Sequence, residues 1–185
     1  MTFNGKIAGA FAALLALAVF AVPAAAAQKM QGMGQHGPGW GQPQARFVEV
    51  RFALTFEGVA TPADKSGRNL SVRAEARAPR DLDKAVTRGK SAVRFDSTVA
   101  NAADGSFMEK GRIAFGGGEL RFESDQRGRL GPSAAPSLQQ GYAVWRVVDG
   151  TGVFRGASGY IVSNFTVGPK GAVKDSEVAV LLLRR

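Results

Sequence analysis

From residue 45 to the end of the chain, apolar and polar residues alternate with a period of two. In the first alternating segment, Val48, Val50, Phe52, Leu54 and Phe56 are separated by residues that are mostly polar or small. Side chains of a β-strand point to opposite faces in turn, so this pattern is typical of a half-buried strand. The alternation restricts the chain to a β fold whose strands each bury one face.

The same alternation recurs in segments separated by Gly, Pro, Asn and Asp, which are typical turn residues. It predicts eight strands, at about residues 47–56, 70–77, 91–99, 106–115, 119–124, 140–148, 159–167 and 176–183. Turns are expected at 58–67 and a Pro/Gly/Ser loop at 128–137, with one or two helical turns at 80–89 capped by Asp81 and ended by Gly89.

Eight strands with short connections indicate an all-β, eight-stranded antiparallel barrel, with a two-sheet sandwich as the alternative. Closure into a barrel removes the exposed edges that an open sheet of this size would present. A barrel of eight strands has room either for packed side chains or for one small ligand. The fold class therefore leaves open whether the interior is filled.

A glycine-rich segment at 149–160 interrupts the alternation and surrounds a single phenylalanine, Phe154, with four glycines. Glycine is favoured where φ is positive or where two backbones pass closely. The segment is therefore expected to form a tight corner between two strands, with Phe154 as the side chain that enters the core.

This segment resembles the signature of the allene oxide cyclase and dirigent families of calycin-like barrels. The matching residues are Gly150, Gly152, Phe154, Gly156, Ala157 and Gly159, preceded by the strand at 143–148 and by paired strands at 111–115 and 118–122. The resemblance implies an eight-stranded barrel, often trimeric, with an apolar cavity. In the cyclases that cavity steers ring closure of an unstable fatty-acid epoxide, and in dirigent proteins it steers radical coupling of phenols. Neither chemistry requires a metal or a nucleotide, and no catalytic residue of either group has a matching motif here.

The amino terminus has the features of a secretory signal peptide over residues 1–27: Lys6, an apolar run at 7–22 and a small-residue site ending at Ala27. An uncleaved membrane anchor is the alternative. We expect cleavage near Ala27, a periplasmic or secreted protein, a flexible Gly/Gln/Pro-rich linker at 28–44 and a barrel domain at 45–185. The linker contains Met30, Met33 and His36, soft or borderline metal ligands that are better explained as part of a polar tail.

Composition excludes several classes of function. The chain has no cysteine and one histidine, His36, so neither a Ser-His-Asp nor a Cys-His catalytic site can be assembled in the barrel. The formal net charge is +9, but the basic residues are spread singly along the strands and not interleaved with aromatics. We therefore expect a solvated basic exterior, no nucleic-acid partner, no cofactor and no bound metal.

Aromatic and polar side chains of the strands are the candidate ligand-binding residues: Phe52, Phe56, Phe95, Tyr142, Trp145, Asn164 and Phe165. A packed core is the alternative explanation for the aromatics. Six strand carboxylates are expected mostly on the solvent face: Glu49, Glu75, Asp96, Glu109, Glu119 and Glu123. If a bulge inverts the first strand, Glu49 becomes a candidate catalytic acid in the cavity and Arg51 its partner.

The sequence thus predicts an exported small barrel that binds a small apolar molecule, with a cofactor-independent isomerase or cyclase activity as the enzymatic variant. The alternative is a non-catalytic structural barrel whose packed interior serves only the fold and whose basic exterior contacts the cell envelope. Stable membrane insertion is not expected, because the chain ends in Leu-Leu-Leu-Arg-Arg and lacks evident aromatic girdles. The family resemblance adds a homo-oligomer, most simply a trimer.

Overall fold

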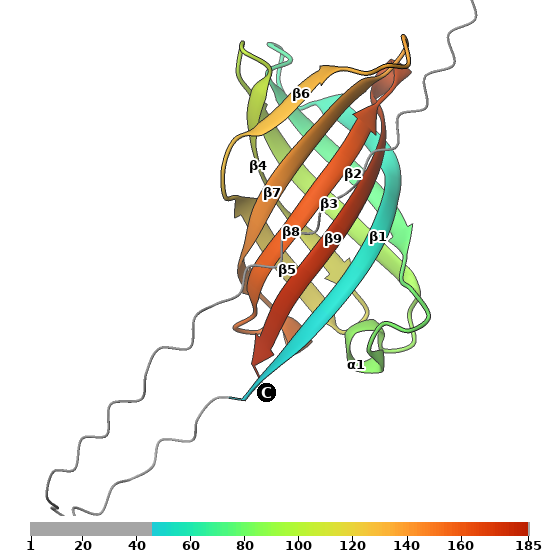
Figure 1. Cartoon of the computed structure of the whole chain (residues 1–185), viewed down its shortest axis with the longest axis vertical. Coiled ribbons are helices and arrows are strands. Elements are labelled where there is room, and N and C mark those ends of the chain that lie inside the picture. The colour runs from blue at the N-terminus through green and yellow to red at the C-terminus, as the bar shows by residue number, and fades with distance from the viewer. Residues whose placement is uncertain (1–45, 185) are drawn as a thin grey trace, which may run out of the picture. The chain divides into compact units, whose positions relative to one another are not determined.

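The computed structural model describes residues 46–184 and is almost entirely β-structure (Figure 1). Its strands are β1 (Phe47–Pro62), β2 (Asn69–Arg77), β3 (Ala92–Asn101), β4 (Ser106–Phe115), β5 (Gly118–Ser124), β6 (Gly128–Pro132), β7 (Gln139–Gly150), β8 (Ser158–Val167) and β9 (Ala172–Arg184). A short helix, α1 (Lys84–Thr87), and two 3-10 turns, η1 (Gly152–Phe154) and η2 (Pro169–Gly171), complete it. Across this range, no helix has the length and apolar character needed to span a bilayer. The expected signal peptide and linker lie outside the described residues.

Eight strands close into an antiparallel barrel, as the alternation predicted. The order around the barrel is β1, β2, β3, β4, β5, β7, β8 and β9, and β9 pairs with β1 to close the ring. One further strand, β6, is not among these eight. The prediction of a loop over the whole of 128–137 was therefore wrong, because residues 128–132 form β6. It pairs with the start of β4 and the start of β7, next to the place where the short strand β5 ends. Together β5 and β6 occupy one position in the barrel wall.

Two strands extend further than their sequence patterns indicated. β1 passes through Gly58 and continues to Pro62, although a turn was expected from residue 58. A Cβ at Gly58 would lie 2.1 Å from the carbonyl oxygen of Arg73, so a glycine is required for the two strands to approach here. β9 begins at Ala172, which pairs with Val59. The extra length comes from pairing with the neighbouring strands, a tertiary effect that periodicity does not report.

The glycine-rich segment forms a tight corner between β7 and β8, as expected. Phe154 is fully buried there, and its ring centroid lies 5.2 Å from that of Phe115. Gly152 has a φ of +58°, and a Cβ on it would lie 2.1 Å from the carbonyl oxygen of Gly117. The corner therefore depends on glycine for both its backbone conformation and its close packing.

The same end of the barrel carries α1, which is shorter than the predicted helical segment (Figure 1). The capping residue is Asp83 and not Asp81: its side chain accepts a hydrogen bond of 2.8 Å from the backbone N–H of Ala85. Val86 is 1% exposed and adds to the core. We call this the closed end, and the opposite one, which bears the β1–β2, β3–β4, β6–β7 and β8–β9 connections, the open end.

Candidate functional site

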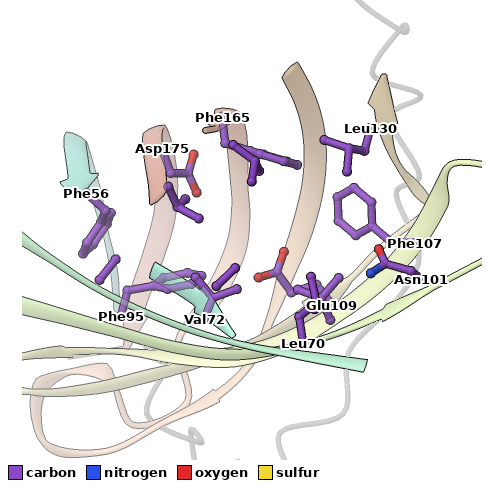
Figure 2. Close-up of a pocket in the computed structure, with 15 residues that line it drawn as sticks. Phe56, Leu70, Val72, Phe95, Asn101, Phe107, Glu109, Leu130, Phe165 and Asp175 are labelled. Atoms are coloured by element: carbon purple, nitrogen blue, oxygen red, sulfur yellow. The ribbon is translucent and has the colours of Figure 1, made fainter. Parts of the chain in front are cut away.

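A pocket enters the barrel from the open end (Figure 2). Its walls are mostly aliphatic and aromatic and include Leu70, Val72, Val99, Phe107, Leu130 and Val173. The cavity has a volume of about 60 Å³. That is enough for several water molecules or a slim ligand, since one water needs roughly 10–15 Å³.

Glu109 is one of two carboxyl groups that interrupt the apolar lining. It lies on β4 and is 8% exposed. The Ser97 hydroxyl donates a hydrogen bond of 2.5 Å to Glu109 Oε1, and the Glu109 backbone N–H donates one of 2.8 Å to Ser124 Oγ, at the point where β5 ends. Burial raises the pKa of Glu109 from 4.5 to about 8; the Ser97 bond opposes this rise, and the charge of Asp175 adds to it. At neutral pH, Glu109 is mostly a neutral acid.

Asp175, on β9, is the second carboxyl group in the pocket and is 6% exposed. The Ser163 hydroxyl on β8 donates a hydrogen bond of 2.7 Å to Asp175 Oδ1. Burial raises the pKa of Asp175 from 3.8 to about 6, and the Ser163 bond limits the rise. At neutral pH, Asp175 is therefore mostly ionised while Glu109 is not.

Two residues later on β9, Glu177 is buried more deeply, with 1% exposure. Neither of its carboxyl oxygens has a hydrogen-bond partner among residues 46–184, and the same holds for the indole N–H of Trp145. Burial raises the pKa of Glu177 well above 4.5, and the charges of Asp175 and Glu109 raise it further. An unpaired buried carboxyl costs stability, typically about 1–3 kcal/mol, so this part of the interior is not optimised for packing.

Glu109, Asp175 and Glu177 form what we call the acid cluster. The buried polar residues of the described chain are these three acids and four serines, with no lysine, arginine or histidine among them. No group of three or more His, Cys, Asp or Glu in residues 46–184 is arranged to hold a metal ion. The cluster can donate hydrogen bonds as neutral acids or attract a cation as carboxylates.

Three of the seven predicted ligand-binding residues, Phe56, Phe95 and Phe165, line this pocket. Phe52 is buried elsewhere, with its ring centroid 5.4 Å from that of Phe115. Trp145 is also in the core and stacks on Phe122 at 4.4 Å, so both side chains match the packed-core alternative.

The remaining two predicted ligand residues, Tyr142 and Asn164, lie on the outer surface. They are cross-strand partners on β7 and β8, and the Tyr142 side chain is on the exposed face, with 50% exposure. Ala143 and Ser163, next to them in sequence, are the residues that point inward. Tyr142 and Asn164 therefore do not contribute to the pocket.

Glu49 and Arg51 also lie on the outer face. They pair with each other, with 2.5 Å between Arg51 Nε and Glu49 Oε1, and both side chains are exposed. The β1–β9 pairing runs without a register shift, so the bulge that would have turned them inward is absent. The carboxyl groups of the pocket come from β4 and β9 instead.

The expectation of solvent exposure was wrong for one strand carboxylate, Glu109, and neither Asp175 nor Glu177 was among the predicted site residues. The alternation along β9 did indicate that these two acids point inward. Asp175 and Glu177 have the same strand parity as Ala179 and Leu181, which are fully buried. Parity, and not charge, determines which way these side chains point.

No family model matches the chain, and no curated protein matches it in sequence. Among solved structures it is similar to two pterocarpan synthase dirigent proteins. For PsPTS1 the TM-score is 0.50 at 15% identity, covering 74% of this chain and 96% of that one. For GePTS1 the TM-score is 0.49 at 15% identity, covering 82% and 97%. The likeness to PsPTS1 shows that the chain has a dirigent-like barrel fold, as the glycine-rich segment indicated.

Proposed function

We propose that the protein binds a small apolar molecule in the pocket at the open end of the barrel. The observation that carries this proposal is a partly enclosed space with apolar walls in which Glu109 and Asp175 are the only ionisable side chains among the described residues that line it. Such sites, largely apolar with a few converging polar groups, are typical of small-molecule binding. The dirigent-like fold supports the same function, since the similar structure PsPTS1 carries the name pterocarpan synthase.

An isomerase or cyclase activity is the enzymatic variant of this proposal. Glu109, a neutral acid at neutral pH in an apolar wall, is suited to give a proton to a bound ligand and take one back, which rearranges the ligand with no cofactor. Glu109→Gln would then abolish turnover while binding persists. A ligand carrier without turnover remains our preferred form, because no substrate-specific motif is present.

Ligand binding is tested by the thermal stability of the full chain with small apolar additives and by native mass spectrometry of the purified protein. Val72→Phe, which fills the pocket, is expected to abolish any ligand-dependent rise in melting temperature. Val148→Phe places the same ring on the outer face of β7, where Val148 is 43% exposed, and should leave that rise intact. No co-purified molecule and no additive effect would favour the alternative, a structural barrel that contacts the envelope.

We also propose that the barrel associates with further copies of itself. Five apolar side chains are exposed side by side on β8 and β9: Tyr160, Val162, Val178, Val180 and Leu182. A continuous apolar patch of this kind is expected to be covered by a partner of the same character, and a second copy supplies one. Val178→Lys should shift the sedimentation coefficient to that of a monomer, whereas a monomeric unmodified chain would contradict the proposal.

We also propose that the protein is exported, because residues 1–27 have the features of a secretory signal peptide. The mature protein is expected to begin near Gln28 and to be recovered from the periplasm or the medium. Intact-mass measurement of the protein from its native host tests this. A mature chain that retains residues 1–27 would contradict it.

A further inference from the structure

We infer that the ligand is an organic ammonium ion, with an apolar body among the pocket phenylalanines and a protonated amine between Glu109 and Asp175. This inference rests on the proposed function and adds the chemical class of the ligand. It comes from the two carboxyl groups that face the pocket and from the lack of a basic side chain among the described residues that line it.

The two carboxyl groups reach the pocket from different parts of the barrel wall, Glu109 from β4 and Asp175 from β9, and point into the same space (Figure 2). Around them are the rings of Phe56, Phe95, Phe107 and Phe165. An aromatic ring carries negative charge density on its face and attracts an organic cation, most strongly where water is excluded. Carboxyl groups among phenylalanine rings thus make a site for a positive head group attached to an apolar body.

The acid cluster lacks a cation of its own. Asp175 Oδ1 accepts a bond from Ser163, but the described residues supply no donor to Oδ2. Behind the pocket, Glu177 is 1% exposed with both oxygens unpaired, and the charges of Glu109 and Asp175 act on it. Since no buried side chain in residues 46–184 is basic, an entering ammonium ion would be the compensating charge.

Neutral and anionic ligands fit these groups less well. A ketone or alcohol can accept a hydrogen bond from neutral Glu109, but it leaves the charge of Asp175 buried and uncompensated. A carboxylate would be repelled by Asp175 and would draw no hydrogen bond from a basic group in the pocket.

The side chains that face the cluster determine its pH dependence. Glu109 faces Ser97 on β3, Ser124 on β5 and Trp145 on β7, Asp175 faces Ser163 on β8, and the three acids act on one another. A bound cation favours the ionised form of each acid. At pH 7 binding should therefore release a proton from Glu109, and amine affinity should rise between pH 6 and pH 8.

The experiment is isothermal titration of the full chain at pH 7 with n-hexylamine, 1-hexanol and hexanoate, which share a slim apolar chain and differ in the head group. We expect hexylamine to bind about tenfold more tightly than hexanol, equivalent to 1.4 kcal/mol, and hexanoate to bind more weakly than either. Titration in two buffers of different ionisation enthalpy should show proton release with the amine alone.

Variants test whether the two carboxyl groups cause the preference for the amine. Glu109→Gln and Asp175→Asn should each remove the preference for the amine while hexanol affinity changes little. Glu123→Gln, a matched change on the outer face of β5, should preserve the preference. Hexanol binding as tightly as hexylamine in the unmodified chain would overturn the ammonium inference and leave the proposed function standing. Failure of all three probes to bind would overturn both.

Discussion

The two ends of the barrel share all their strands except β5 and β6, but their interiors differ in polarity. At the closed end, the side chains beneath the η1 corner are apolar and fully or nearly fully buried: Phe115, Leu120, Phe154, Ala157 and Leu181. Toward the open end, the strands present a pocket and the acid cluster in place of further packing. The comparison indicates that the closed end supplies stability, whereas the open end retains groups that reduce it.

A buried carboxyl without a basic partner is costly, and a sequence that only needed to fold would replace it with an apolar side chain. Three such acids from two strands therefore indicate a functional use.

Phe154→Ala should cause the largest loss of stability. Phe154 is fully buried against Phe115, and removal of a buried ring leaves a cavity as well as a loss of transfer free energy. We expect the free energy of unfolding to fall by about 3–5 kcal/mol, measured by urea denaturation. Phe47→Ala removes a ring that is 56% exposed and serves as the control, with a much smaller effect expected. Similar losses in both variants would show that the corner does not anchor the barrel.

The stability of the barrel should decrease as the pH rises from about 4.5 to 8. The folded-state pKa values of Glu109 and Asp175 are raised to about 8 and about 6, so the folded chain holds protons that the unfolded chain has released. Stabilisation by these protons is complete below the unfolded-state pKa values and is lost as the pH passes through the folded ones.

Glu109→Gln should flatten this profile. Over three pH units the difference between the two proteins should change by on the order of 3 kcal/mol, in the direction that favours the variant at high pH. Denaturation at pH 5, 6, 7 and 8 measures it. Parallel profiles for the variant and the unmodified chain would rule out a buried neutral acid at this position.

Glu177→Leu should stabilise the protein at pH 7, by about 1–3 kcal/mol, because it removes a buried carboxyl whose oxygens have no hydrogen-bond partner among the described residues. Thermal or urea unfolding measures the change. Glu123→Leu alters a half-exposed carboxylate on β5 and should change stability by at most about 0.5 kcal/mol. A destabilised Glu177→Leu variant would mean that this carboxyl has a role in packing that the structure does not show.

The smallest effect is expected for Ser163→Ala. It removes the hydrogen bond to Asp175 Oδ1 and should raise the pKa of Asp175 above about 6, with a loss of stability of about 1 kcal/mol at neutral pH. NMR titration of the Asp175 carboxyl carbon gives the pKa directly. An unchanged titration midpoint would show that Ser163 does not influence this group.

The sequence predicted the closed end better than the open end, for a physical reason. At the closed end, periodicity and glycine conformation act locally, so strand positions and the burial of Phe154 follow from nearby residues. At the open end, the extension of β1 through Gly58 and the whole of β6 depend on pairing with distant strands. The short Gly- and Pro-containing segment of β6 has no alternating pattern to reveal it.

The acid cluster was missed because the charge of Glu109 was taken to place it on the solvent face, and because Asp175 lay just before the strand predicted at 176–183. Glu109 alternates in step with Phe107 and Ile113, both buried, just as Asp175 and Glu177 alternate in step with Ala179. A charged residue in step with an apolar face is unusual on energetic grounds, and that makes it a marker of a functional interior.

The central claim is that the open end holds a neutral acid, Glu109, in a ligand pocket, and the titration of Glu109 tests it most directly. Carbon-13 NMR of the Glu109 carboxyl should give a midpoint of about 8 in the free protein, and a lower one when the protein is saturated with n-hexylamine. A midpoint near the ordinary value of 4.5, unaffected by the amine, would contradict both the buried acid and its proposed role.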